Sequence, residues 1–177
     1  MLGKLLLMLV LAKAAPDAAS AVTTIPAAIQ VPAGAKLAHK FHATGAQVYA
    51  CAAAPGGPAP FAWTLKRPDA ILVDAAGAKA GSHGAGPTWT AKDGSAVVGQ
   101  KVAQADAPTP GAVPWLLVRA TSTSGTGVFA AVTYVQRVGT QGGKAPATGC
   151  DAKTVGTETH VDYSADYLFF EKDAAAK

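Results

Sequence analysis

Residues 82–95 read SHGAGPTWTAKDGS, and the pair Asp93 and Gly94 in this stretch is typical of a two-residue β-hairpin turn. A type I′ turn needs positive φ at both central residues, which aspartate and glycine tolerate. Such a turn predicts that Trp89 faces Val98 across the hairpin. An aromatic residue would then pack against a β-branched one, which is a favourable cross-strand pair.

The rest of the chain carries further short β-prone runs, interrupted every few positions by glycine or proline. The sequence contains 19 glycines and 12 prolines, which leave no room for a long helix. Several short strands at turn spacing are typical of an all-β sandwich or barrel. We therefore predict one domain of short antiparallel strands with Gly/Pro-rich loops, with strands at residues 47–51, 61–65, 70–73, 115–118, 128–138 and 160–170.

The run at residues 160–170 is rich in aromatic side chains. Tyr163, Ala165, Tyr167 and Phe169 occupy alternate positions, so they share one face of a strand. This alternation indicates a closing strand of the sheet.

The first 21 residues have the pattern of a secretory signal peptide: a basic start, a short apolar run and small residues at a cleavage site. Cleavage after Ala14 and after Ala21 both fit, and we favour Ala21. The apolar run is too short to cross a bilayer, which takes about 20 residues in a helix. We expect a signal peptide at residues 1–21, a single β-rich domain at 22–170 and a frayed tail at 171–177, in a soluble protein that is secreted or periplasmic.

The charge pattern and the cysteines narrow the function classes. The net charge is +4 with scattered lysines and no basic stripe, so we do not expect a nucleic-acid-binding protein. Cys51 and Cys150 are the two cysteines, and in an exported chain they predict a disulfide, with two free buried thiols as the alternative. Two cysteines this far apart make a poor metal site, and we assign no metal and no cofactor.

Two motifs suggest enzymes, and their context argues against both. Residues 80–84 resemble a nucleophile elbow, and residues 83–86 resemble the oxyanion loop of some esterases. In the esterase fold these two motifs are separate segments, whereas here they overlap. Residues 125–130 match a dinucleotide fingerprint but continue into a β-branched run instead of a helix. We assign no catalytic residue, and we expect these glycines to form a turn.

Several motifs occur in the order typical of one known group of proteins; they lie at residues 45–51, 81–89, 93–95, 114–117, 134–138, 142–146 and 163–167. Over about residues 25–170 the chain resembles the exported bacterial and fungal proteins grouped as domain of unknown function 3455. That family has no settled activity to carry over. The resemblance implies that the following residues occupy signature positions: His83, Gly86, Pro87, Trp89, Asp93, Gly94, Trp115, Gln136 and Arg137.

Our leading hypothesis is a non-enzymatic exported protein that binds a small molecule or an envelope component. The candidate ligand-binding residues are His83, Trp89, Asp93, Trp115 and Arg137. The two tryptophans would form a stacking platform if they are exposed, and the alternative is core packing. For Arg137 the alternative is an ion pair or a carbonyl tether.

Two other hypotheses remain open on the sequence alone. One is a small secreted enzyme or metalloprotein with a site around His83 and Asp93. The other is a structural protein without a small ligand, whose stability depends heavily on the Cys51 to Cys150 bridge.

Overall fold

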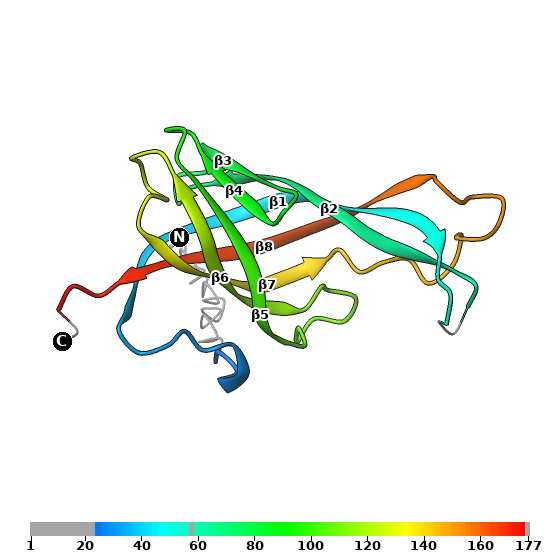
Figure 1. Ribbon diagram of the computed structural model, residues 1–177, viewed down its shortest axis with the longest axis horizontal. Helices are drawn as coiled ribbons and strands as arrows, with labels where there is room; N and C mark the ends of the chain where they lie inside the picture. The colour runs from blue at the N-terminus through cyan, green and yellow to red at the C-terminus, as the bar shows by residue number, and fades with distance from the viewer. Residues whose placement is uncertain (1–23, 57–58, 176–177) are drawn as a thin grey trace, which may run out of the picture.

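The computed structural model describes residues 24–56 and 59–175. In this part of the chain eight antiparallel strands form a closed barrel, in which each strand pairs with its neighbours in sequence and β8 pairs with β1 (Figure 1). The prediction of an all-β fold is confirmed, and of its two forms the chain adopts the barrel. The strands are β1 Ala35–Ala53, β2 Phe61–Val73, β3 Lys79–Gly84, β4 Thr88–Ala91, β5 Ala96–Ala105, β6 Trp115–Ser124, β7 Val132–Gly142 and β8 Glu158–Lys172.

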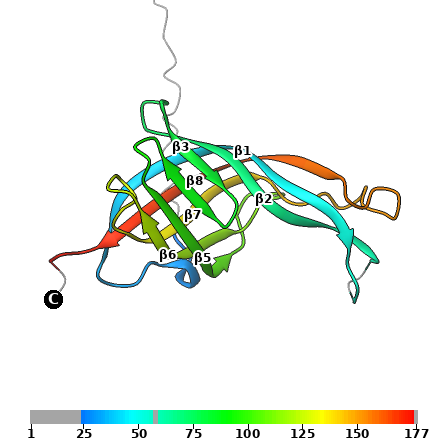
Figure 2. The ribbon, with the colours of Figure 1, turned by 45° about the horizontal axis from the view of Figure 1, so that its top comes forward.

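The strands differ greatly in length, and the longest ones extend beyond the rest. Figures 1 and 2 show β1, β2 and the segment leading into β8 projecting past the shorter strands as an arm. The arm carries the disulfide between Cys51, in β1, and Cys150, in the connection from β7 to β8. The predicted disulfide is therefore confirmed. Within residues 24–56 and 59–175, we find no helix long and apolar enough to cross a membrane.

The two strands predicted at residues 61–65 and 70–73 are one strand, β2. Pro68 lies inside this strand, although proline cannot donate a ladder hydrogen bond. It is tolerated because β2 pairs with β3 only from Ala70 onward, so that Pro68 has β1 alone as its strand partner.

The predicted two-residue turn at Asp93 and Gly94 is wrong in type and register. Trp89 pairs with Val97, and the loop contains three residues between Ala91 and Ser95. A type I′ turn needs a positive φ at both central residues. Gly94 has a φ of 85°, but among the described residues only glycines have a positive φ, so Asp93 does not meet this condition. A three-residue loop that ends with a left-handed glycine is the next most common hairpin connection.

Several strand ends also differ from the sequence prediction. The strand predicted at residues 47–51 is part of the longer β1 (Ala35–Ala53), and the one predicted at 115–118 continues to Ser124. Residues 128–131 form a turn, and β7 begins at Val132. The turn buries Phe129 completely in the barrel interior, so the β-prone composition of this run reflects burial. At the other end, β8 continues through Lys172, which pairs with Ala35 and lies two residues beyond the predicted end of this strand at residue 170.

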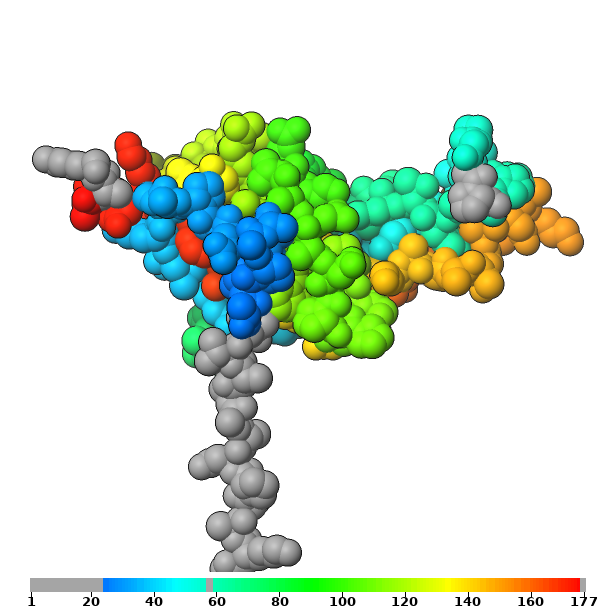
Figure 3. Space-filling model, turned by 90° about the horizontal axis from the view of Figure 1, so that it is seen from below, coloured from blue at the N-terminus to red at the C-terminus, as the bar shows by residue number. Residues whose placement is uncertain are grey.

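The core has two parts. Inside the barrel, aromatic side chains fill one half, with Phe129 stacked on Phe169 at 4.4 Å between ring centroids and Phe41 edge-on to both. Outside the barrel, the segment that contains the short 3-10 helix η1 (Ala27–Ile29) packs on the wall, and Ile29 lies against Trp115. Figure 3 shows this segment, in blue, lying against the green surface around β5.

Candidate functional site

The barrel wall is incomplete where β3 and β4 end. These two strands are short because residues 85–87 turn the chain back, and Gly86 adopts a φ of 110° that favours glycine there. The strands on either side, β2 and β5, continue past this turn. A pocket of about 310 Å³ opens in the gap, and we call it the window pocket.

The window pocket has a rim and an inner wall. The rim is formed by residues 65–68 of β2, by Gly86 and Pro87 of the turn and by Lys101 of β5. The inner wall is formed by inward-facing side chains from six strands: Gln47, His83, Trp89, Leu116, Val118, Arg137 and Tyr167. The volume of the window pocket is at the lower end of the range for small-molecule sites.

His83 and Trp89 form the aromatic centre of the pocket. Their rings are stacked with centroids 4.5 Å apart and an angle of 7° between planes. Tyr167 lies edge-on to both rings, at centroid distances of 5.0 Å and 5.5 Å. The stack follows from pairing, because His83 and Trp89 are direct cross-strand partners on β3 and β4.

Gly99 on β5 makes room for the Val118 side chain beside the Trp89 indole. A Cβ atom at this position would lie 2.3 Å from a Val118 methyl group and 3.4 Å from the Trp89 ring. The bare backbone of Gly99 therefore avoids an overlap with Val118, whereas the indole would only be in close contact with such a Cβ atom.

His83 is neutral in the folded protein. Burial lowers the pKa of His83 to about 3, and the side chain is only 4% exposed. Its Nδ1–H donates to the carbonyl of Thr88 at 3.0 Å, which leaves Nε2 as an acceptor. A histidine with this pKa is a weak base at neutral pH, so His83 is poorly suited to general base catalysis.

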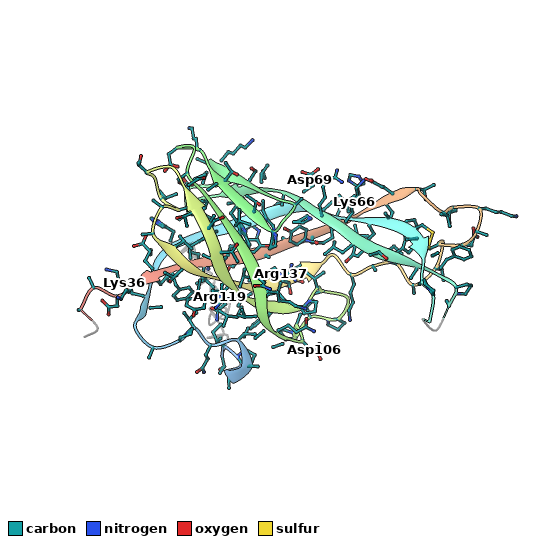
Figure 4. All side chains as sticks on the ribbon, viewed as in Figure 1. Lys36, Lys66, Asp69, Asp106, Arg119 and Arg137 are labelled. Atoms are coloured by element: carbon teal, nitrogen blue, oxygen red, sulfur yellow. A yellow bond between two sulfur atoms is a disulfide. The ribbon has the colours of Figure 1, made fainter. Side chains whose placement is uncertain are left out.

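Arg137 is the innermost cation of the window pocket. It is 8% exposed, and both Nε and Nη2 donate to the carbonyl of Pro114, at 3.1 Å and 2.8 Å. Its guanidinium also acts on the phenol beside it: burial raises the pKa of Tyr167, and the charge of Arg137 partly opposes that shift. The carbonyl tether expected as the alternative for Arg137 is present. Figure 4 labels Arg137 on β7 and Lys66 on β2.

Two buried donors of the inner wall lack a well-formed hydrogen bond. Trp89 Nε1 hydrogen-bonds to no atom within the described residues, and Gln47 Nε2 has no partner with full hydrogen-bond geometry there, although the Gln47 side chain interacts with the nearby Tyr163 phenol. Buried polar groups in folded proteins are nearly always bonded, so such exceptions need a physical explanation. A third unpartnered donor, Trp115 Nε1, belongs to the outer cluster around Ile29 and not to this pocket.

Neither tryptophan forms the exposed platform considered from the sequence. Trp89 is 1% exposed and Trp115 is 2% exposed. The two also lie on opposite sides of the barrel wall, because Trp89 belongs to the interior cluster and Trp115 to the outer one. Only the part of the Trp89 side chain that lines the window pocket is available to a ligand, since His83 covers one face of the ring.

Asp93 lies at the other end of the β3–β4 hairpin from the window pocket. Its carboxylate accepts hydrogen bonds from Ser95 N (2.9 Å), Ser95 Oγ (2.6 Å) and Val128 N (2.8 Å). The Ser95 hydroxyl, followed by the Val128 amide, holds the pKa of Asp93 below its usual value. Asp93 therefore braces a turn, and the hypothesis of a joint His83 and Asp93 site finds no geometric support.

No cluster of three or more histidine, cysteine, aspartate or glutamate side chains suited to a metal ion occurs in the described part of the chain. A larger hollow of about 800 Å³ lies on the outer surface between β1 and β8, near Asp69, His160 and Asp162. It is shallow and open to solvent. The window pocket is the better candidate because it reaches buried polar atoms.

The comparison with protein families matches the part of the chain that forms the barrel. A family model described as a protein of unknown function (DUF3455) matches residues 32–171. The chain belongs to the DUF3455 family. The DUF3455 match begins before β1 and ends within β8, so that it spans the whole barrel. No curated protein and no solved structure is significantly similar to the chain.

Sequence reasoning on this DUF3455 protein named three residues of the window pocket, His83, Trp89 and Arg137. It missed Gln47 and Tyr167 as site residues. Tyr167 belongs to the alternating aromatic face of the closing strand, which was a usable signal for an inward-facing side chain. For Gln47 the signal was weaker: it is a polar residue at an interior position of a β-prone run.

Proposed function

We propose that this DUF3455 protein is an exported protein that binds one small, largely apolar molecule in the window pocket. The observation that carries the proposal is the pair of buried, unpartnered donors, Gln47 Nε2 and Trp89 Nε1, on the inner wall of an aromatic pocket. Burying such a donor without a hydrogen bond lowers the stability of the folded protein. Both nitrogen atoms have almost no exposed surface, so a bound molecule with acceptor atoms would satisfy them once the two side chains turn toward it.

Export is supported by two separate features. The pattern of a signal peptide falls on residues 1–21, which lie outside the described residues. The disulfide between Cys51 and Cys150 fits an oxidising compartment, where such bonds form and persist.

The direct test of binding uses 2-naphthalenemethanol, a neutral aromatic compound, in a calorimetric titration. We expect saturable one-to-one binding to the wild-type protein. The variant Leu116→Trp adds bulk on the inner wall of the window pocket and should abolish binding. The matched control is Leu37→Trp, the same substitution at an exposed position of β1, which should bind as wild type does.

Two outcomes would contradict the proposal. One is a wild-type protein that binds neither this compound nor its carboxylate counterpart, 2-naphthoate, at millimolar concentration. The other is binding that Leu116→Trp leaves unchanged, which would place the compound elsewhere. The natural ligand can be sought by native mass spectrometry of the protein purified from its own host, where a bound molecule adds its mass to the chain.

A further inference from the structure

The window pocket contains a buried cation without an anion. Arg137 forms no ion pair with any carboxylate in the described chain, where the ion pairs involve Lys40, His42, Lys66 and Arg67. A guanidinium stays charged under all ordinary conditions. Burying a charge is costly unless it is paired and hydrogen-bonded, and a single carbonyl supplies only part of that compensation.

The free edge of the guanidinium has a definite shape. Nε–H and one N–H of Nη2 are taken by the carbonyl of Pro114. The guanidinium also hydrogen-bonds to the phenol of Tyr167, which helps to oppose the rise of the Tyr167 pKa. The second N–H of Nη2 and one N–H of Nη1 are parallel and form the fork that a carboxylate accepts through both oxygens, so a bound carboxylate would share this edge with Tyr167.

The surroundings of Arg137 favour an anion as well. The lining of the window pocket includes Lys66, Arg67 and Lys101, and it contains no aspartate or glutamate among the residues that the structure describes. Lys66 and Arg67 share the carboxylate of Glu158, which neutralises part of their charge. Lys101 donates to the neutral amide of Gln104 at 2.9 Å and keeps its charge uncompensated.

The rest of the lining suits an apolar body. Trp89, Leu116 and Val118 present aromatic and aliphatic surface next to Arg137. The unpartnered amide of Gln47 adds one more donor on the inner wall. The protein places few hydrogen-bond acceptors on this wall. The Nε2 atom of neutral His83 is one of them.

We propose that the ligand of the window pocket is a small aromatic or apolar carboxylic acid, whose carboxylate binds the free edge of Arg137 and whose body packs against Trp89, Leu116 and Val118. This inference rests on the proposed function, because it specifies the chemistry of a ligand in the same pocket. One inner guanidinium and a pocket of about 310 Å³ fit one carboxylate on a compact body.

The test compares two compounds that differ in the head group alone. Calorimetric titration of the wild-type protein at neutral pH uses 2-naphthoate and, as its neutral counterpart, 2-naphthalenemethanol. We expect the carboxylate to bind at least about tenfold more tightly, which is the effect of one charge-assisted hydrogen-bonded pair. Equal or weaker binding of the carboxylate would overturn this inference and leave the proposed function intact, whereas no binding of either compound would overturn both.

A pair of variants tests the role of Arg137 itself. Arg137→Gln should remove the preference for 2-naphthoate and bring the two affinities to within about a factor of two. The reason is that the charged pair with Arg137 supplies the difference of about tenfold. Arg119→Gln is the matched control: it makes the same change at an exposed position on β6 and should keep the preference. A folded Arg137→Gln protein that still prefers 2-naphthoate would overturn the assignment to Arg137 and point to the rim cations.

Arg137→Gln also weakens the tether to Pro114, so its folding must be checked by thermal melting. If it does not fold, Arg137→Lys takes its place. That variant keeps the charge but loses the two-pronged geometry, and it should lower the preference for the carboxylate several-fold. An unchanged preference would overturn the proposed contact with the fork. The comparison of the two compounds on the wild-type protein decides the proposal without any variant.

Discussion

The imidazole of His83 lies flat on the indole of Trp89, with ring centroids 4.5 Å apart, inside a barrel that gives the histidine almost no contact with water. The two residues are cross-strand neighbours on the shortest hairpin of the barrel. The same pair therefore closes the core on one side and lines the window pocket on the other.

Burial of neutral His83 makes the protein sensitive to acid. The pKa of His83 is about 3 in the folded protein and 6.5 in the unfolded chain, so the unfolded state binds more protons between these values. Stability is therefore greatest above the unfolded pKa and falls as the pH drops toward 3. In this window we expect a loss of about 1.4 kcal/mol per pH unit from this group alone.

The measurement is the free energy of unfolding in urea from neutral pH down to acid. His83→Phe should be less stable at neutral pH, because the Thr88 carbonyl loses its donor. Its curve should be flatter below pH 6.5 than the wild-type curve. The carboxylates are common to both proteins, so equal slopes would contradict a buried neutral His83.

The two buried tryptophans should be protected from quenchers. Trp89 and Trp115 lie in the two clusters of the core, whereas Trp63 lies on the arm and is only partly buried. We expect Trp63→Phe to remove most of the fluorescence that acrylamide can quench and to leave blue-shifted emission. Strong quenching of the remaining emission would show that the interior stack is open to solvent.

The disulfide should contribute strongly to stability. Cys51 and Cys150 are separated by 99 residues, and closing a loop of that length removes chain entropy from the unfolded state. We expect the double variant Cys51→Ala and Cys150→Ala to lose about 4 to 5 kcal/mol, measured in guanidinium titrations. Wild-type protein unfolded in reductant is the control and should match the variant. A loss below about 2 kcal/mol would show that the unfolded chain is already compact without the bridge.

Asp93 should stabilise the fold without affecting ligand binding. Asp93→Ala removes the acceptor of Ser95 and Val128, so the melting temperature should fall more than in Lys92→Ala, a change at the neighbouring exposed residue of the same turn. Because the folded pKa of Asp93 is lowered, its contribution is present above the unfolded pKa and is lost as the pH falls through the folded value. Titration with 2-naphthoate should be unchanged. Weakened binding in a fully folded Asp93→Ala protein would contradict this separation.

Gly127 provides a second test of the same turn. A Cβ atom at this position would overlap the Asp93 carboxylate, with its nearest atom 1.9 Å away. Gly127→Ala should therefore displace Asp93 and lower the melting temperature as Asp93→Ala does. Additive losses in the double variant would argue against a shared mechanism.

Local patterns predicted the features that depend on neighbouring residues. The aromatic alternation of residues 163–169 identified the closing strand, and the even cysteine count identified the disulfide. The turn at Asp93 was located correctly but given the wrong type. Its three-residue form is consistent with the bonds of the Asp93 carboxylate to Ser95, which the sequence pair Asp93 and Gly94 does not reveal.

The window pocket depends on contacts between distant parts of the chain. His83 and Trp89 were candidate residues, but their stacking depends on the exact register of β3 and β4. The gap in the wall arises because these strands stop before β2 and β5 do, and strand ends are poorly defined by composition. The lack of a carboxylate beside Arg137 is a property of the assembled barrel and has no local signal.

The pairing of β1 with β8 also limits when this protein can fold. Residues 35–53 have one of their two neighbours in β2, but the other consists of residues 158–172, which are synthesised more than about a hundred positions later. Without that segment the other strands can form only an open sheet with two unpaired edges, and such edges recruit other chains. The barrel therefore cannot close before residues 158–172 are available, and until then the chain must be kept apart from its own copies.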